Sequence, residues 1–420
     1  MTVASSKKSS ALSTTFTASR KMSQGTSTDP YKIAILPGDG AGPEMMEATL
    51  EILQALSSMT DIYFQFQTAH FGSEAYLKLG KPVPEETIEI CKNSDAVLRG
   101  YEGYTRTAST GNQQLRSALG LFAQLRPVVV YKELADMSTL KRQVVEGVDI
   151  MVVREVSGGA LSIDENTAPF GENESEAFST IKYKDSQVYR IMEIAASIAS
   201  RRSGRICNVD KADVMKVSQF WRRCIHDFVK QNISGGYIDI CDMYADDCAR
   251  ELILRPRQFD TIITSNLFGD IISEVAVALA GPARLSPSAW LSIDGFGVYG
   301  PADVFNISAY PESTLPAYSS NTSREDGGFG NFKPYTSPIA MIRSASMMLR
   351  YSLDQPAAAD LLQQALQRTM EDILNSEVSQ NGSFLESGAI GTKAFVEAML
   401  RSLQYLKQYV QVCDPEICGE

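Results

Sequence analysis

The stretch FDTIITSNLFGDIISE, residues 259–274, joins a short apolar run to a longer apolar segment that contains two acids. FDTIITS has the length and the β-branched content of a buried strand, and the segment after it predicts a helix. Asp270 and Glu274 lie one helical turn apart, so their carboxylates project from the same face. Apolar neighbours argue against full exposure of this face. Two like charges near a core are stable only if a positive group lies between them.

The same alternation of strand and helix runs along most of the chain. Further strands are predicted in YKIAILPGDG (31–40), IYFQFQTA (62–69), DAVLRG (95–100), VDIMVVRE (148–155) and GRICNVDK (204–211). Helical spacing of apolar residues follows the first of these strands, and the segment 213–231 is also helical. Alternating strands and helices predict an α/β fold.

Composition limits the class of protein. The 420 residues carry a net charge of −11, which argues against a nucleic-acid partner. No apolar run is long enough for a membrane span, so no membrane partner is expected. The seven scattered cysteines indicate reduced thiols in an intracellular protein, cytoplasmic or mitochondrial. Residues 1–30 are rich in Ser and Thr and are basic, which is typical of a disordered tail or a transit peptide.

A third acid joins the pair in the opening stretch. Asp246 lies in YADDCAREL, before the helix that carries Asp270 and Glu274. Three carboxylates that converge on one point would bind a hard divalent cation, Mg²⁺ or Mn²⁺, because such ions prefer oxygen ligands. A solvated helical face is the alternative explanation, and the apolar neighbours favour the metal.

Basic residues form a second candidate group. Arg116 and Arg126 lie in LRSALGLFAQLRP, and Arg154 ends an apolar strand in VVREVSGG. Guanidinium groups near a core usually have carboxylate or phosphate partners, although each alone could be an ordinary surface arginine. Lys211 ends the strand NVDK and could act as a base if burial or nearby cations lower its pKa.

In this order, the motifs resemble the isocitrate/isopropylmalate dehydrogenase family of metal-dependent β-decarboxylating dehydrogenases. The blocks that carry the resemblance are LPGDGAGPE, LRSALGLFAQLRP, VVREVSGG, VDKADVMKVSQFWR, FDTIITSNLFGDIISE, SPIAMIRSASMML and GTKAF. The resemblance implies a two-domain fold with a large mixed sheet flanked by helices. Residues 31–121 and 282–420 would form the large, cofactor-side domain, and residues 122–281 would form the small domain with the substrate and metal residues and the dimer interface.

The resemblance also implies roles for individual residues. Arg116, Arg126 and Arg154 match the arginines that clamp the carboxylates of a malate-type substrate. Asp246, Asp270 and Glu274 match the metal ligands, although the last is usually Asp. Lys211 matches the lysine that assists deprotonation of the C2 hydroxyl. In the family the active sites of a homodimer are shared, and the partner subunit supplies the lysine and the first acid. NAD(P) accepts a hydride before the β-carboxylate is lost.

Three departures from the family pattern stand out. Leu161 occupies the position of the Tyr that protonates the product. The glycine-, proline- and aromatic-rich segment 295–335 is longer than the family's nucleotide-binding loop and lacks its histidine and lysine. Ahead of Arg116, Thr110 and Asn112 fall where isocitrate enzymes bind a third carboxylate. These polar groups favour a polar third arm on the substrate, because facing an isopropyl group would leave them unpaired.

Three hypotheses follow. The first is a non-redox decarboxylase, lyase or isomerase acting on a malate-, citrate- or aconitate-like acid. The second is an NAD(P)-dependent oxidative decarboxylase of a 2-hydroxy di- or tricarboxylic acid, with a rebuilt cofactor loop. The third is a non-catalytic regulatory or binding relative. The missing Tyr and the altered loop narrowly favour the first hypothesis, whereas the complete clamp and acids argue against the third.

Overall fold

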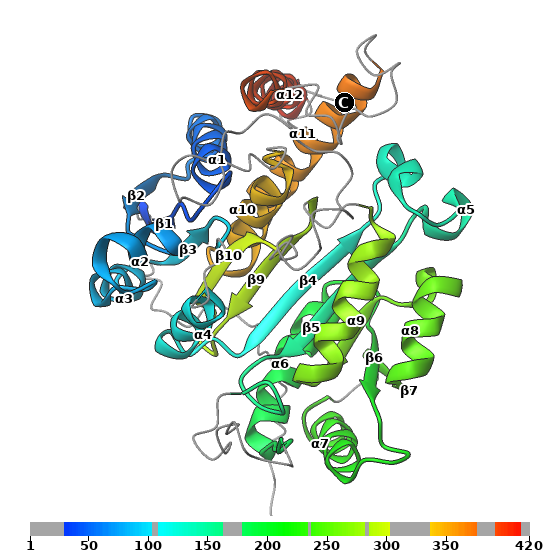
Figure 1. Cartoon of the computed structure of the whole chain (residues 1–420). Helices are drawn as coiled ribbons and strands as arrows, with labels where there is room; N and C mark the ends of the chain where they lie inside the picture. Colours follow the sequence, from blue (N-terminus) through cyan, green and yellow to red (C-terminus); the bar gives the residue numbers. More distant parts are fainter. Residues whose placement is uncertain are drawn as a thin grey trace, which may run out of the picture.

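The computed structural model describes residues 29–102, 108–162, 179–233, 237–281, 285–302, 337–375 and 391–412. These residues form an α/β fold in which one mixed sheet of ten strands is flanked by helices (Figure 1). The fold class predicted from the sequence is therefore confirmed. In the described part of the chain, no helix is both long enough and apolar enough to cross a membrane.

The strands of the sheet lie in the order β2-β1-β3-β10-β9-β4-β5-β8-β6-β7. Their bounds are β1 Tyr31–Leu36, β2 Phe64–Thr68, β3 Ala96–Arg99, β4 Ala123–Val129, β5 Asp149–Glu155, β6 Arg205–Asp210, β7 Asp239–Tyr244, β8 Thr261–Thr264, β9 Pro287–Leu291 and β10 Gly297–Pro301. Pairing is parallel except along β10–β9–β4–β5, where each neighbour is antiparallel. Each strand predicted from the sequence is present.

The helices are α1 Gly42–Ser57, α2 Ser73–Leu79, α3 Glu85–Lys92, α4 Ala108–Ala118, α5 Arg142–Val145, α6 Asp185–Ser200, α7 Lys216–Asn232, α8 Ala245–Leu254, α9 Asn266–Leu279, α10 Ile339–Tyr351, α11 Pro356–Leu374 and α12 Thr392–Val412, with short 3-10 turns at Lys132–Met137 and Pro256–Gln258. Helix α10 is buried along almost its whole length, which explains its continuous run of apolar and small residues. Helix α9 lies across β4 and β5 and so brings its acids to the middle of the sheet (Figure 1).

The sheet continues across the predicted domain boundary. Strand β4 belongs to the predicted small domain and β9 to the predicted large domain, yet they pair directly from Ala123–Leu291 to Leu125–Ala289. Val153 of β5 and Leu291 of β9 belong to the same cluster of buried apolar side chains. The division into two domains remains a prediction, and the strand pair β4–β9 forms the seam between them.

The glycine-rich turn after β1 has a structural role. Gly38 has a φ of 71°, and a Cβ atom there would lie 2.0 Å from the carbonyl oxygen of Tyr101. Asp39 in the same turn accepts hydrogen bonds from the backbone N–H groups of Ser73 (2.8 Å) and Glu74 (3.1 Å). Its carboxylate therefore satisfies donors at the start of α2.

Candidate active site

Two buried arginines lie side by side at the centre of the sheet. Arg126 of β4 and Arg154 of β5 are 5% and 8% exposed. Gln124 is the direct cross-strand partner of Arg154, and Arg126 lies two residues further along β4, so these side chains project from one face of the sheet. Helix α9 covers this face (Figure 1).

The two acids of the opening stretch pair with these arginines. Glu274 accepts a hydrogen bond from Nη1 of Arg126 at 2.7 Å, and Asp270 forms an ion pair with Nη1 of Arg154. Asp270 remains 52% exposed and Glu274 37% exposed, whereas their arginine partners are buried. The positive groups expected beside this acidic pair are therefore two arginine side chains of the same chain.

Two amides fix Arg154, and the sequence analysis missed both. The side-chain oxygen of Asn266 accepts hydrogen bonds from Nε (3.1 Å) and Nη2 (2.7 Å) of Arg154. Gln124 accepts a third bond from Nη1 at 3.3 Å. Burial lowers the pKa of Arg154, and the charge of Asp270 opposes that effect. The only sequence signal for Asn266 was its place at the start of the helix, directly after a buried strand.

Arg116, the third arginine of the predicted clamp, approaches the same face from α4. Its guanidinium carbon lies 5.1 Å from the centre of the Trp290 ring, and that of Arg99 lies 4.8 Å from the same ring. Trp290 is the cross-strand neighbour of Gln124, which bonds to Arg154. A chain of contacts therefore links the three predicted clamp arginines to one face of β9, β4 and β5.

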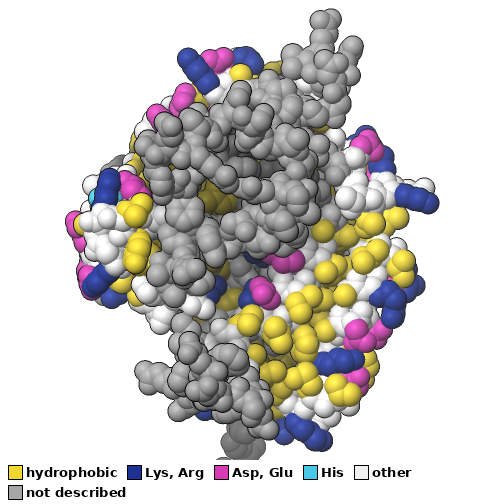
Figure 2. Space-filling model, in the orientation of Figure 1, with side chains coloured by type: hydrophobic (Ala, Val, Ile, Leu, Met, Phe, Trp, Pro, Cys, Tyr) yellow, Lys and Arg dark blue, Asp and Glu magenta, His cyan; other side chains and the backbone are white. Residues whose placement is uncertain are grey.

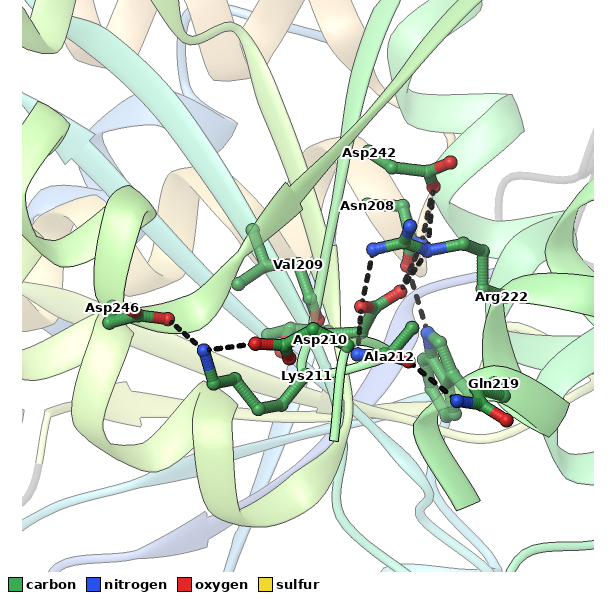
Figure 3. A network of polar contacts seen from close by, with 12 residues as sticks. Asn208, Val209, Asp210, Lys211, Ala212, Gln219, Arg222, Asp242 and Asp246 are labelled. Carbon is green, nitrogen blue, oxygen red and sulfur yellow. Dashed lines mark hydrogen bonds and ion pairs between the residues drawn. The ribbon is translucent and has the colours of Figure 1, made fainter. Parts of the chain in front are cut away.

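Lys211 and Asp246 form a second group at the ends of β6 and β7 (Figure 3). The Lys211 ammonium donates to Asp246 at 2.7 Å and lies 3.0 Å from a carboxylate oxygen of Asp213. Hydrogen bonds to Asp246 and Asp213 raise the pKa of Lys211. The condition under which Lys211 would act as a base, a pKa lowered by burial or nearby cations, is not met by these contacts, because the neighbouring charges are negative.

The three predicted metal ligands do not converge within one chain. Asp246 pairs with Lys211, while Asp270 and Glu274 lie with the arginines on α9. Within the described ranges, no group of three His, Cys, Asp or Glu residues could hold a metal ion. The family resemblance implies that Asp246 comes from the partner subunit, so the shared metal site remains a prediction. The arrangement leaves open the sharing between subunits that the family resemblance implies.

The position of the missing Tyr is also visible. Leu161 is 41% exposed and has no proton to donate. A different phenol lies close by: the Tyr183 hydroxyl accepts a hydrogen bond from the backbone N–H of Asn266 at 2.8 Å. Burial raises the pKa of Tyr183, so this hydroxyl stays protonated. A Cβ atom on Gly159 would lie 2.3 Å from the Tyr183 oxygen, so the glycine makes room for the ring.

Two predicted features fall partly or wholly outside the described residues. Thr110 belongs to α4, but its side chain is not among those described. Asn112 is half-buried, and its backbone N–H donates to the carboxylate of Glu102 at 3.2 Å. Most of the long segment in place of the family's nucleotide-binding loop, residues 303–336, lies outside the described residues.

Comparison with known proteins decides the family. A sequence model of the family described as "Isocitrate/isopropylmalate dehydrogenase" matches residues 32–399. The chain belongs to this family. It is 37% identical to the 3-isopropylmalate dehydrogenase of Synechococcus elongatus over an alignment of 392 residues that covers 90% of this chain and 98% of the relative. The enzyme of the same name from Prochlorococcus marinus is also 37% identical, over 87% of this chain and 99% of its own.

Solved structures agree on the fold. The crystal structure of isocitrate dehydrogenase from Methylococcus capsulatus has a TM-score of 0.70 at 23% identity and covers 89% of this chain and 99% of its own. The sequence-based assignment to the family is confirmed. The chain is an enzyme of the β-decarboxylating dehydrogenase family. Its relatives are named for a dehydrogenase reaction, so the comparisons favour the oxidative hypothesis over the non-redox hypothesis that the sequence analysis preferred.

Proposed function

We propose that this protein is an NAD(P)-dependent enzyme that oxidises and decarboxylates a malate-type 2-hydroxy acid with the help of Mg²⁺ or Mn²⁺. The observation that carries the proposal is the pairing of Arg126 and Arg154, both buried, with the exposed acids Glu274 and Asp270. Buried guanidinium groups recognise carboxylates in fixed geometry, and exposed carboxylates are suited to a hard cation.

The two arginines and the two acids balance in charge, and a substrate carboxylate would redistribute these pairs. A substrate carboxylate replaces Asp270 and Glu274 as the partner of the arginines, which frees both acids to bind the divalent cation. Their donor atoms are carboxylate oxygens, which fit Mg²⁺ or Mn²⁺. Asp246 of a second copy would complete the ligand set. The cation, when bound, supplies a Lewis acid at the C2 oxygen.

The reaction balances for any 3-substituted malate. A nicotinamide cofactor, when bound, would supply the hydride acceptor that oxidation of the C2 alcohol to a ketone requires. The bond between C3 and its carboxylate then breaks, and CO₂ leaves. Lys211 of the second copy would handle the protons. Asp246 and Asp213 raise its pKa, and that pKa would fall once Asp246 binds the cation, so Lys211 would then take the proton of the C2 hydroxyl and return a proton towards C3. The product is a 2-oxo acid one carbon shorter.

A homodimer is the second part of the proposal. Three large apolar side chains on α8 and α9 are exposed: Ile253 by 48%, Leu254 by 58% and Ile271 by 56%. Yellow side chains gather on this face of the molecule (Figure 2). An apolar patch of this kind marks a protein interface. If two copies pack through these helices, Asp246 of one copy approaches α9 of the other. Ile271→Asp should lower both the fraction of dimer, measured by its mass in solution, and the activity. A variant that is monomeric and still active would contradict active sites shared between subunits.

The C3 substituent distinguishes two substrates. Relatives are named for 3-isopropylmalate, whose arm is apolar. Half-buried Asn112 at the approach to Arg116 instead favours a polar arm, as in isocitrate. Purified protein should be assayed with 3-isopropylmalate, isocitrate and malate, each with NAD⁺ or NADP⁺ and with Mg²⁺ or Mn²⁺. The reduced nicotinamide and the released CO₂ are measured together.

The expected result is equimolar formation of reduced cofactor and CO₂ that stops when EDTA removes the cation. A faster rate with isocitrate than with 3-isopropylmalate would support the polar arm. CO₂ release without cofactor reduction would overturn the oxidative reaction in favour of the non-redox one. Asn112→Leu tests whether Asn112 selects a polar C3 substituent, because this variant should shift the substrate preference towards 3-isopropylmalate.

A further inference from the structure

Arg222 of α7 contacts the ends of two neighbouring parallel strands at once. These strands, β6 and β7, lead directly to Lys211 and to the helix that carries Asp246 (Figure 3). Residues at the carboxyl ends of parallel strands are where α/β proteins place their functional groups. A side chain that ties two such ends together therefore controls the distance between the groups that follow them.

The first tie is to Asp210, the residue before Lys211. Arg222 donates two hydrogen bonds to its carboxylate, from Nε at 2.8 Å and from Nη2 at 2.7 Å. Asp210 is only 1% exposed and also accepts from the backbone N–H of Ala212 at 2.9 Å. On the other side of the turn, Gln219 donates to the carbonyl of Ala212 at 2.8 Å. The Lys211 backbone is thus held on both sides from α7.

The second tie is to β7 through Tyr244. The guanidinium carbon of Arg222 lies 5.3 Å from the centre of the Tyr244 ring, and Nζ of Lys211 lies 5.1 Å from the same centre. Tyr244 ends β7 and precedes α8, whose first turn carries Asp246. Arg222 also lies 3.7 Å from a carboxylate oxygen of Asp242 on β7. One aromatic ring therefore contacts both the lysine and the arginine.

We propose that Arg222 is a positioning residue that fixes Lys211 against Asp246 by bridging Asp210 at the end of β6 to Tyr244 at the end of β7. This inference rests on the proposed function in one respect, namely that Lys211 handles the substrate proton. Arg222 itself makes no contact with the Arg126–Arg154 group in the described residues. Its loss should therefore affect the chemical step and leave binding of the acid almost unchanged.

The first experiment compares Arg222→Ala and Arg222→Lys with Arg223→Ala. Arg223 is the adjacent residue on the same helix, is exposed, and lies over the Phe220 ring at 5.2 Å, so it is a matched control. Misplacing a catalytic group by about 1 Å can reduce a rate about 100-fold. We expect Arg222→Ala to lower kcat by about that factor while KM for the acid changes less than about threefold. Arg222→Lys keeps the charge but loses the bidentate hydrogen bond to Asp210. Its kcat should therefore lie between that of the wild type and that of Arg222→Ala.

The second experiment needs no turnover. Lys211 is acetylated with a water-soluble amine reagent, and its labelling rate is measured by peptide mass spectrometry against the exposed Lys182. Release of Lys211 from its carboxylates in Arg222→Ala should raise that ratio at least about fivefold, whereas Arg223→Ala should not change it. If Arg222→Ala fails to fold, judged by circular dichroism, the same comparison is made with Arg222→Lys.

The outcomes separate the two proposals. A lower kcat with constant KM, together with faster labelling of Lys211, supports the positioning role. Unchanged labelling overturns it, whatever the activity. An equal fall in kcat for Arg223→Ala also overturns it, because the effect would then be general to α7. If the wild-type protein turns over no malate-type acid, the proposed function fails, and the labelling result alone decides whether Arg222 positions Lys211.

Discussion

A single methyl group added at Gly269 should displace Arg154, one of the arginines of the proposed substrate clamp. Gly269 lies in α9, one residue before Asp270, and the helix passes directly over Arg154. A Cβ atom at this position would lie 2.6 Å from Cγ, 2.9 Å from Cδ and 3.0 Å from Cβ of Arg154. These atoms are near the root of a buried side chain whose guanidinium is bonded to Asn266 and Gln124. The side chain therefore cannot move aside without breaking those bonds.

Two opposing effects set the change in stability for Gly269→Ala. Overpacking a filled site costs about 1–3 kcal/mol. Replacing Gly by Ala inside a helix contributes about 1 kcal/mol in the other direction. The free energy of unfolding should thus fall by roughly 0–2 kcal/mol. The effect on binding should be larger, because a charge-assisted hydrogen bond is worth about 1.5–3 kcal/mol and KM for the acid should rise about 10- to 100-fold.

The assay is a double-mutant cycle with Arg154→Ala, followed by urea unfolding. Arg154→Ala removes Cγ and Cδ, so Gly269→Ala in that background should stabilise the protein by up to about 1 kcal/mol. The coupling energy should then be about 1–3 kcal/mol. Gly391→Ala, where a Cβ would meet nothing within 4 Å, is the control. A coupling below about 0.5 kcal/mol, as for independent sites, would refute the reasoning.

Three shorter predictions concern other parts of the molecule. Trp290→Leu removes the aromatic ring that contacts the Arg116 guanidinium. The loss of about 1 kcal/mol should raise KM for the acid about fivefold, whereas Trp290→Phe should retain most of the affinity. Lys211→Ala should lower kcat about 100- to 10,000-fold but leave binding of the acid intact by calorimetry. The Glu251 pKa is lowered to about 2 by its hydrogen bond from Arg255, so this pair stabilises the fold above pH 4.5 and loses its effect as the pH falls towards 2. Glu251→Gln should therefore make unfolding less pH-dependent between these values, and an unchanged profile would contradict that role.

The fold and the site residues could be predicted from the sequence to different extents. Strand–helix alternation is a local pattern, so the α/β class and the strands at 31–36 and 261–264 followed directly. Arg126 and Arg154 could be singled out because a guanidinium in an apolar strand needs a partner. The partners Asn266 and Gln124 could not, because amides are common and only the pairing of strands brings them to Arg154.

The pKa of Lys211 depends on contacts that the sequence does not reveal. Asp213 lies two residues after Lys211 and Asp246 lies in α8, yet both carboxylates contact the Lys211 ammonium. A lowered pKa would require burial or nearby cations, whereas the neighbours of Lys211 are anions. The sign of a pKa shift is set by the balance of burial, nearby charges and hydrogen bonds, and this balance requires coordinates.

The β4–β9 seam has a consequence for any attempt to dissect the protein. Residues 122–281 expressed alone would expose the edge of β4 along Ala123, Gln124 and Leu125, all of which are almost fully buried. The complementary half, residues 31–121 joined to residues 282–420, would expose β9 in the same way. Unpaired, apolar strand edges are templates for intermolecular pairing. Each half should therefore aggregate when produced alone. The two halves should be soluble when co-expressed, because β4 of one half then pairs with β9 of the other.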